Sequence, residues 1–370
     1  MKLNNYIELI KLSIRLFKNG QVSLKKIVNF LHNGYSSIFR MAKAGKLPSA
    51  IIIEPVNYCN IRCTGCGFEL CGQIQKKQKL SMECFVKIFD EVKDYIFFLV
   101  LENGGEPFLN RDLLRMIKYA YDNKVPTITS TNADFKTGDR WGEEVIESYL
   151  DTLIVSVSGH DNESHSIYHK NGNFNRVMGS AKKIISAKRK LRKSHPDLIL
   201  RFIQTKDNKE SVNIIERQYR DLGFDKLDVR KTATEHLIYK RSPDDKVKIL
   251  TVGGDNTIYP NFCADLYFIP DVLVDGTVAP CCFTYLFPPN MGNVFDDHGM
   301  KNVWNNNNYA EMRKKVANNR MNIPACSVCN GSFGYSGENW NRSSKIEIYT
   351  PYHKPTKGPQ PQGTTATISK

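Results

Sequence analysis

The sequence predicts a mixed α/β protein, in which a partial (β/α)6 barrel of the TIM type is followed by a smaller, cysteine-rich domain. The chain of 370 residues is long enough to bury one large core and a second, smaller one. Over residues 46–250, short apolar runs alternate with amphipathic segments, which indicates parallel strands joined by right-handed helical crossovers. Residues 251–335 then hold five of the ten cysteines, which indicates a domain that binds metal.

The barrel region contains six predicted strands. They span residues 50–55, 97–102, 127–131, 152–157, 198–205 and 226–231. The amphipathic segments between them predict helices at residues 81–95, 111–123, 142–149, 177–193 and 209–222. An open barrel and a doubly wound sheet both satisfy this alternation, so the motifs have to decide between them.

The N-terminal extension, residues 1–45, is predicted to form two helices, at residues 4–18 and 23–41. Residues 1–46 carry nine Lys or Arg and one acid, which gives +8 of the total net charge of +14. One interpretation is a basic amphipathic helix on an anionic membrane surface. The other is a helical cap that packs on the next domain and leaves a basic face in solvent.

The sequence predicts a cytoplasmic protein. It would be peripheral to a membrane if the N-terminal basic helix lies on an anionic membrane surface. No apolar run approaches the roughly 18 residues of a membrane span, and no signal-peptide pattern precedes the barrel. Cysteines in a reducing compartment favour metal ligation over disulfides. No nucleic-acid partner is expected.

Residues 336–370, which become rich in Pro, Thr, Gly and Gln, are predicted to be a largely disordered tail.

A C-x3-C-x2-C loop, formed by Cys59, Cys63 and Cys66, follows the first strand. Four thiolates saturate a [4Fe–4S] cluster, so three on one loop leave one iron open to a substrate. Zinc is the alternative, although structural zinc sites prefer paired C-x2-C ligands. The loop therefore predicts a catalytic iron–sulfur site.

Polar motifs also follow the later strands. Gly104-Gly105-Glu106-Pro107 comes after the second strand, where the glycines allow close backbone approach and Glu106 can accept from an ammonium group. The remaining candidates at strand ends are Ser130, Asn132, Ser156, Ser158 and Gln204, which could also be ordinary capping residues. Because a barrel collects its active site at the carboxyl ends of its strands, these positions favour the barrel.

The cysteine loop and the Gly-Gly-Glu-Pro motif resemble those of the radical S-adenosylmethionine (SAM) superfamily over residues 46–335. The resemblance implies that SAM chelates the open iron through its amino and carboxylate groups, and that Glu106, Ser130, Asn132, Ser156, Ser158 and Gln204 lie near SAM. It also implies an external electron donor such as flavodoxin or ferredoxin. One departure is Gly65, where the family often has a bulky residue against adenine; Phe68 is then the alternative adenine contact.

The second cysteine set resembles that of SPASM and twitch domains, and its spacing is similar to that of 2-deoxy-scyllo-inosamine dehydrogenase-like enzymes. Its proposed ligands are Cys263, Cys281, Cys326 and Cys329, which would saturate one auxiliary [4Fe–4S] cluster. A zinc knuckle on the same cysteines is the alternative. Cys282, Cys71 and Cys84 are expected to be packed thiols without a ligand role.

The resemblance implies an oxidoreductase that starts from hydrogen-atom abstraction. The auxiliary cluster as electron acceptor would make the net reaction the oxidation of a sugar or cyclitol alcohol, with a general base that the sequence does not identify. One alternative is modification of a ribosomally made peptide. Another, of a different class, is a non-catalytic iron–sulfur or zinc scaffold, which would not need the Gly-Gly-Glu-Pro motif.

Overall fold

The computed structural model describes residues 20–64, 66, 77–205, 207–231, 237–241, 247–251, 261–281, 291–323, 326 and 347–350. Every structural statement below concerns these residues. The predicted helix at residues 4–18, the tail beyond residue 350, and Cys71, Cys282 and Cys329 lie outside them, as do Gly65 and Phe68.

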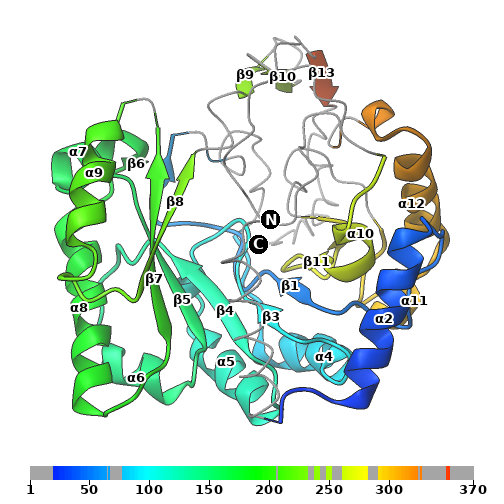
Figure 1. Ribbon diagram of the computed structural model, residues 1–370, viewed down its shortest axis with the longest axis horizontal. Coiled ribbons are helices and arrows are strands. Elements are labelled where there is room, and N and C mark those ends of the chain that lie inside the picture. Colours follow the sequence, from blue (N-terminus) through cyan, green and yellow to red (C-terminus); the bar gives the residue numbers. More distant parts are fainter. Residues whose placement is uncertain are drawn as a thin grey trace, which may run out of the picture.

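The central feature is a curved sheet of eight strands in the order β12-β11-β1-β3-β4-β5-β7-β8 (Figure 1). The strands are β1 (Ile51–Ile53), β3 (Leu99–Val100), β4 (Thr127–Thr131), β5 (Thr152–Val157), β7 (Asp197–Gln204), β8 (Lys226–Lys231), β11 (Asp271–Val272) and β12 (Val278–Ala279). All neighbours from β11 to β8 are parallel, and β12 returns antiparallel to β11. The predicted α/β fold with a partial barrel is therefore confirmed, and all six predicted strands are present.

Helices cover the outer side of this sheet (Figure 1). They are α4 (Met82–Val92), α5 (Leu113–Asp122), α6 (Trp141–Glu147), α8 (Phe174–Lys190) and α9 (Lys209–Gln218). Side-chain N-caps explain where two of these helices begin. Ser81 accepts from Cys84 N at the start of α4, and Asn173 accepts from Arg176 N at the start of α8. The apolar faces of these helices and of the strands form one core.

The strands distinguish an outer from an inner face by simple alternation. On β7, Leu198, Leu200 and Phe202 are buried in the core, whereas Ile199, Arg201 and Ile203, which alternate with them, are only half-buried. The same alternation places Ser130 on the inner face of β4. The charged residue of this part of β7, Arg201, is thus on the inner face.

Two smaller sheets are separate from the main sheet. One joins β2 (Arg62–Cys63) to β6 (His169–Lys170), which follows the short helix α7 (Asn162–Tyr168). The other is a three-stranded antiparallel sheet of β9 (Leu237–Arg241), β10 (Val247–Thr251) and β13 (Glu347–Thr350). The strand β13 lies within residues 336–370, which are predicted to be largely disordered; its Ile348, Tyr349 and Thr350 are residues that favour a strand.

The second domain shares the sheet of the barrel. The hairpin β11–β12 lies beyond the predicted boundary at residue 250, yet β11 pairs with β1 in register, Ile52 opposite Asp271. Val272 and Val278 join the common core. The helices here are α10 (Asp265–Phe268), α11 (Met300–Trp304) and α12 (Asn307–Asn319), with the 3₁₀ turn η3 (Arg320–Asn322); another 3₁₀ turn, η1 (Pro107–Leu109), follows β3 in the barrel.

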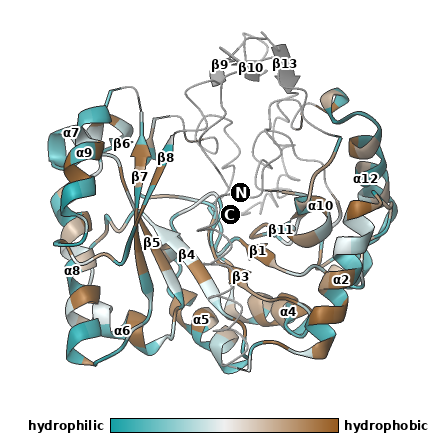
Figure 2. Cartoon of the chain, in the orientation of Figure 1, coloured by the Kyte–Doolittle hydropathy of each residue, from teal (hydrophilic) through white to brown (hydrophobic). Residues whose placement is uncertain are grey.

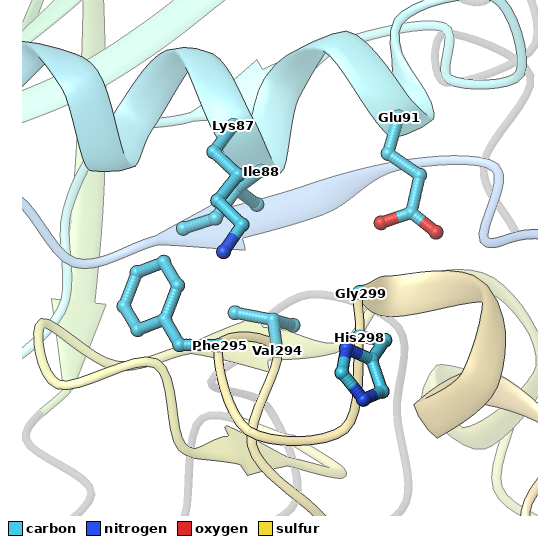
Figure 3. Close-up of a pocket in the computed structure, with 7 residues that line it drawn as sticks. All are labelled: Lys87, Ile88, Glu91, Val294, Phe295, His298 and Gly299. Atoms are coloured by element: carbon cyan, nitrogen blue, oxygen red, sulfur yellow. The ribbon is translucent and has the colours of Figure 1, made fainter.

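A pocket of about 260 Å³ marks the outer seam between α4 and the second domain (Figure 3). Lys87 Nζ lies 5.6 Å from the centre of the Phe295 ring. Glu91 of α4 accepts from Met300 N and Lys301 N at 2.6 and 2.7 Å, so its carboxylate caps α11 from another domain. These contacts fix the two domains relative to each other.

The remaining helix, α2 (Leu24–Ile38), begins with Ser23 as its N-cap. Its face toward the protein is mostly polar, and most of its apolar residues are exposed. The membrane and cap interpretations concern the basic amphipathic helix at residues 4–18, which lies outside the described residues, so both stay predictions. No described helix is both long enough and apolar enough to cross a bilayer.

Candidate active site

The cysteine loop follows β1 and is held by the segment after β5. Arg62 and Cys63 pair with Lys170 and His169 across the β2–β6 ladder. Thr64 N donates to Tyr168 O at 2.8 Å, and Cys66 N donates to Cys63 O at 3.1 Å. The described cysteines are all free thiols. The loop therefore presents its three thiols from a fixed backbone.

Asn132, at the end of β4, contacts this loop directly. Its Nδ2 donates to Cys59 Sγ at 3.4 Å and to Asn60 Oδ1 at 3.0 Å. Asn60 Nδ2 in turn donates to Asp134 O at 2.6 Å. Asn132 was predicted as a SAM-binding residue; the structure places its amide at the first cysteine thiol.

Glu106 joins the Gly-Gly-Glu-Pro motif to the same strand end. Its carboxylate accepts from Thr131 Oγ1 at 2.7 Å, from Asn132 N at 2.7 Å and from Phe108 N at 3.2 Å. Burial raises the pKa of Glu106 to about 7, and these three donors lower it only in part. The carboxylate thus has protein partners already, and Oε2, with one donor, keeps acceptor capacity for a ligand.

Gly105 is required for a reason other than the one predicted. A Cβ at this position would lie 2.6 Å from Tyr58 O and still closer to Val56 O. Glu106 N also donates to Tyr58 O at 3.0 Å. The close approach that the sequence predicts for a ligand is made by the backbone of the cysteine loop, so the two motifs pack directly against each other.

The other predicted SAM contacts divide into two groups. Ser130 and Ser156 are half-buried on the inner faces of β4 and β5. Ser158 is fully buried, and its hydroxyl contacts His165 O and His169 Nδ1 at 2.9 and 2.6 Å. Gln204 shares its strand face with Phe202, the side covered by helices. Ser130 and Ser156 therefore lie on the inner face of the sheet, whereas Gln204 lies on the opposite face and the Ser158 hydroxyl is engaged by His165 and His169.

Three charged residues on the inner face, Arg201, Asp228 and Arg230, are not among the candidates from the sequence. Arg201 Nε and Arg230 Nε donate to the two carboxylate oxygens of Asp228, at 3.0 and 2.7 Å. Arg201 pairs in register with Ser156 on β5 and with Asp228 on β8. The available signal was charged residues that alternate with apolar ones at the period of the inner face: Arg201 in β7, and Asp228 and Arg230 in β8.

Buried acids form a second group that the sequence did not single out. Glu54, at the end of β1, accepts from Gly104 N at 3.2 Å and from Val274 N at 3.0 Å, so it links the Gly-Gly-Glu-Pro loop to the second domain. Burial raises the pKa of Glu54 to about 7. Asp271 is fully buried on neighbouring β11, and neither of its carboxylate oxygens has a hydrogen-bond partner. Burial and the nearby acids raise its pKa well above the ordinary range.

The second cysteine set converges in part within the described residues. Buried Arg320 donates to Phe262 O at 3.4 Å and to Cys326 O at 3.0 Å, which ties the segment of Cys263 to that of Cys326. The hairpin β11–β12 leads directly to Cys281. Cys84, by contrast, packs against the core beside α5, as expected of a thiol without a ligand role.

The donor chemistry fits iron–sulfur clusters. Among the described residues, no three His, Cys, Asp or Glu side chains are gathered tightly enough to hold a single metal ion. A [4Fe–4S] cluster does not need such a group, because each thiolate binds a different iron. Three thiols on one rigid loop, beside the Glu106 and Asn132 network, define an iron–sulfur site at the mouth of a partial barrel.

Family comparisons agree with this class of site. The model of the radical SAM superfamily matches residues 53–199, and the SPASM iron–sulfur cluster-binding domain matches residues 263–330. The chain belongs to the radical SAM superfamily and carries a SPASM domain, so it is a radical SAM enzyme whose cofactors are SAM and [4Fe–4S] clusters. Zinc at the two cysteine sets and a purely structural scaffold are thereby rejected. A search of curated proteins finds no match.

Two solved structures of SuiB show the same fold, and a third solved structure, that of BtrN, is also similar. SuiB of Streptococcus suis bound to S-adenosylmethionine is 13% identical with a TM-score of 0.58, covering 84% of this chain and 79% of that one. SuiB bound to the precursor peptide SuiA is 15% identical with a TM-score of 0.57, covering 87% and 81%. BtrN in complex with AdoMet and 2-DOIA is 17% identical with a TM-score of 0.48, covering 81% and 99%.

Proposed function

We propose that this radical SAM enzyme oxidises an alcohol of a sugar or cyclitol to a ketone, with the auxiliary cluster as electron acceptor. The observation that carries the proposal is the charged inner face of β7 and β8, where Arg201, Asp228 and Arg230 are held by mutual hydrogen bonds. Such preformed donors and acceptors suit a small substrate with many hydroxyl groups. The cysteine content of the second domain adds support, since four proposed ligands saturate one cluster.

Cys59, Cys63 and Cys66 would hold the first cluster, which would supply reductive cleavage of SAM and hence a radical that abstracts hydrogen. Oxidation of the alcohol would remove one hydrogen atom from its carbon, one proton from its hydroxyl to a base, and one further electron, which the auxiliary cluster would accept. Cys263, Cys281, Cys326 and Cys329 would hold this acceptor.

The chain's own residues organise the site around these groups. Glu106 and Asn132 hold the cysteine loop against β4. Glu54 connects the Gly-Gly-Glu-Pro loop to the second domain through Val274 N, so the two cluster-binding regions keep a fixed separation. An external donor such as flavodoxin or ferredoxin would supply the first electron, and we propose that the enzyme works in the cytoplasm.

The test uses the reconstituted holoenzyme with SAM, a reductant and a panel of sugars and cyclitols. The substrate should raise 5′-deoxyadenosine formation and appear as a ketone in equal amount. Cys281→Ala and Cys326→Ala should still cleave SAM without substrate but form no ketone, while the matched control Cys84→Ala should form it. Thermal melting identifies variants that fold. Product formation by a folded Cys281→Ala variant would refute the acceptor role.

Modification of a ribosomally made peptide is the second candidate. The observation in its favour is the likeness in fold to SuiB, which was solved with the precursor peptide SuiA. A peptide substrate would make 5′-deoxyadenosine formation depend on a peptide, and no sugar or cyclitol would stimulate it. The same assay therefore separates the two candidates.

A further inference from the structure

The helix α2 packs on the protein through its polar side. Its buried residues are Lys26, Asn29, Asn33, Ser36 and Ser37. Asn29 Nδ2 and Asn33 Nδ2 both donate to Leu47 O, at 2.8 and 2.9 Å, and Asn33 Oδ1 accepts from Gly45 N at 2.7 Å. Hydrogen bonds, together with the ring of Phe30 against Phe97 and Phe268, therefore attach this helix. The opposite, apolar side is left without a partner among the described residues.

That apolar side is exposed along the whole helix, at the edge of the molecule in Figure 2. Leu24, Leu31 and Ile38 are 76%, 62% and 75% exposed, and with Val28 and Tyr35 they recur every three or four residues as one stripe. Of the eleven exposed large hydrophobic residues in the described part of the chain, only Ile167 and Met321 lie outside residues 24–41. We call the apolar side of α2 the outer stripe; its members are Leu24, Ile27, Val28, Leu31, Tyr35, Ile38 and Phe39, with Met41 just beyond the helix. Phe30, although partly exposed, packs on the protein against Phe97 and Phe268 and is not part of the stripe.

The surroundings of the outer stripe are basic. Residues 20–46 contain five Lys or Arg and no acid. Lys25 pairs with Asp94 at 2.7 Å and Lys26 is buried, but Arg40, Lys43 and Lys46 are exposed just beyond the end of the helix. The residues before Gly20 add four more basic groups and one acid.

We propose that the outer stripe is a membrane-contact surface, which lies in the interface of an anionic bilayer with its basic neighbours at the head groups. An amphipathic helix with a bulky apolar side and adjacent Lys and Arg suits this position. A second copy of the chain is a poorer occupant, because a symmetric contact would place the same basic residues opposite each other. The proposal concerns the location of the enzyme and holds for either candidate substrate.

The experiment is co-sedimentation of the full-length holoenzyme with vesicles. One set contains phosphatidylglycerol and phosphatidylcholine in equal parts, and the other contains phosphatidylcholine alone. The protein should bind the anionic vesicles and dissociate as salt rises. Leu31→Asp and Ile38→Asp should each weaken binding by about tenfold or more, since each takes a large apolar side chain out of the acyl boundary. Met321→Asp, an exposed apolar position away from α2, is the matched control and should bind like the wild type.

SAM cleavage without substrate should be unchanged in Leu31→Asp and Ile38→Asp, which shows that both variants fold and hold their clusters. Equal binding of these variants and the wild type overturns the proposal, as does equal binding to neutral vesicles. A dimer that forms in buffer and is lost in Leu31→Asp would assign the outer stripe to a second copy and also overturn it.

Discussion

At the scale of single residues, the site depends on a few side chains that join motifs far apart in the sequence. Glu106 and Asn132 connect the Gly-Gly-Glu-Pro loop, the end of β4 and the cysteine loop. Gly105 permits this contact because a side chain there would enter the space of Tyr58 O. The sequence predicts each motif, but it does not predict that Gly105 and Asn132 both contact the cysteine loop.

Gly105→Ala should therefore disrupt the cysteine loop. Because the obstructing atoms are backbone carbonyls, the loop has to move, and we expect loss of SAM cleavage and of the iron held by the first cluster. Iron content and 5′-deoxyadenosine formation measure this. Gly179→Ala is the control, since Gly179 lies on an exposed part of α8 with no atom within 4 Å of the added Cβ. A Gly105→Ala enzyme with normal iron content would show that the loop tolerates the change.

Asp271→Asn should flatten the pH dependence of stability. The pKa of Asp271 is raised in the folded protein. Its contribution to the free energy of unfolding is therefore complete below the unfolded pKa of about 3.9, and it is lost as pH rises through the folded pKa. The loss approaches about 1.4 kcal/mol per pH unit while the folded carboxyl stays protonated. Urea unfolding between about pH 5 and about pH 8 should show a smaller decline for Asp271→Asn. The exposed Asp139→Asn serves as control, and identical slopes for Asp271→Asn and wild type would contradict the prediction.

At the scale of elements, the barrel and the second domain share caps and strands. Glu54 accepts from Val274 N, and Glu91 of α4 caps α11 across the seam in Figure 3. The pairing of β11 with β1 extends the barrel sheet into the second domain. These carboxylates accept from backbone N–H groups that need a partner. Each such hydrogen bond therefore stabilises the fold more than an exposed ion pair does.

Glu91→Ala should lower the free energy of unfolding by about 1 kcal/mol, as expected when a helix loses its capping carboxylate. The measurement is the urea midpoint of the holoenzyme. Glu147→Ala is the control, because the ion pair of Glu147 with Arg140 is exposed and should change stability by less than about 0.5 kcal/mol. Equal effects of the two substitutions would show that the cap does not hold α11.

At the scale of the whole molecule, we propose that the two cysteine sets serve separate clusters. The first set lies on the loop after β1; in the second set, Cys263 precedes and Cys281 closely follows the hairpin that pairs with β1. This arrangement predicts that the first cluster can be removed without loss of the second.

Changing Cys59, Cys63 and Cys66 together to Ala should leave about four iron atoms per chain, held by the second domain. SAM cleavage should disappear, because no open iron remains to bind SAM. Iron and sulfide analysis with 5′-deoxyadenosine detection measures both outcomes. Full SAM cleavage by the triple variant would refute the assignment of the first set.

The sequence by itself determined the strand–helix alternation, the limits of β4, β5 and β8, and both cysteine sets, because periodicity and ligand spacing are local properties of the chain. Only the tertiary structure decided which strand-end residues lie on the inner face: strand face and burial separate Ser130 and Ser156 from Gln204 and Ser158. It also decided the pairing of Arg201 with Asp228 and the orientation of α2. An amphipathic helix has two usable faces, and in α2 the hydrogen bonds of Asn29 and Asn33 to residues beyond the helix turned the apolar face outward.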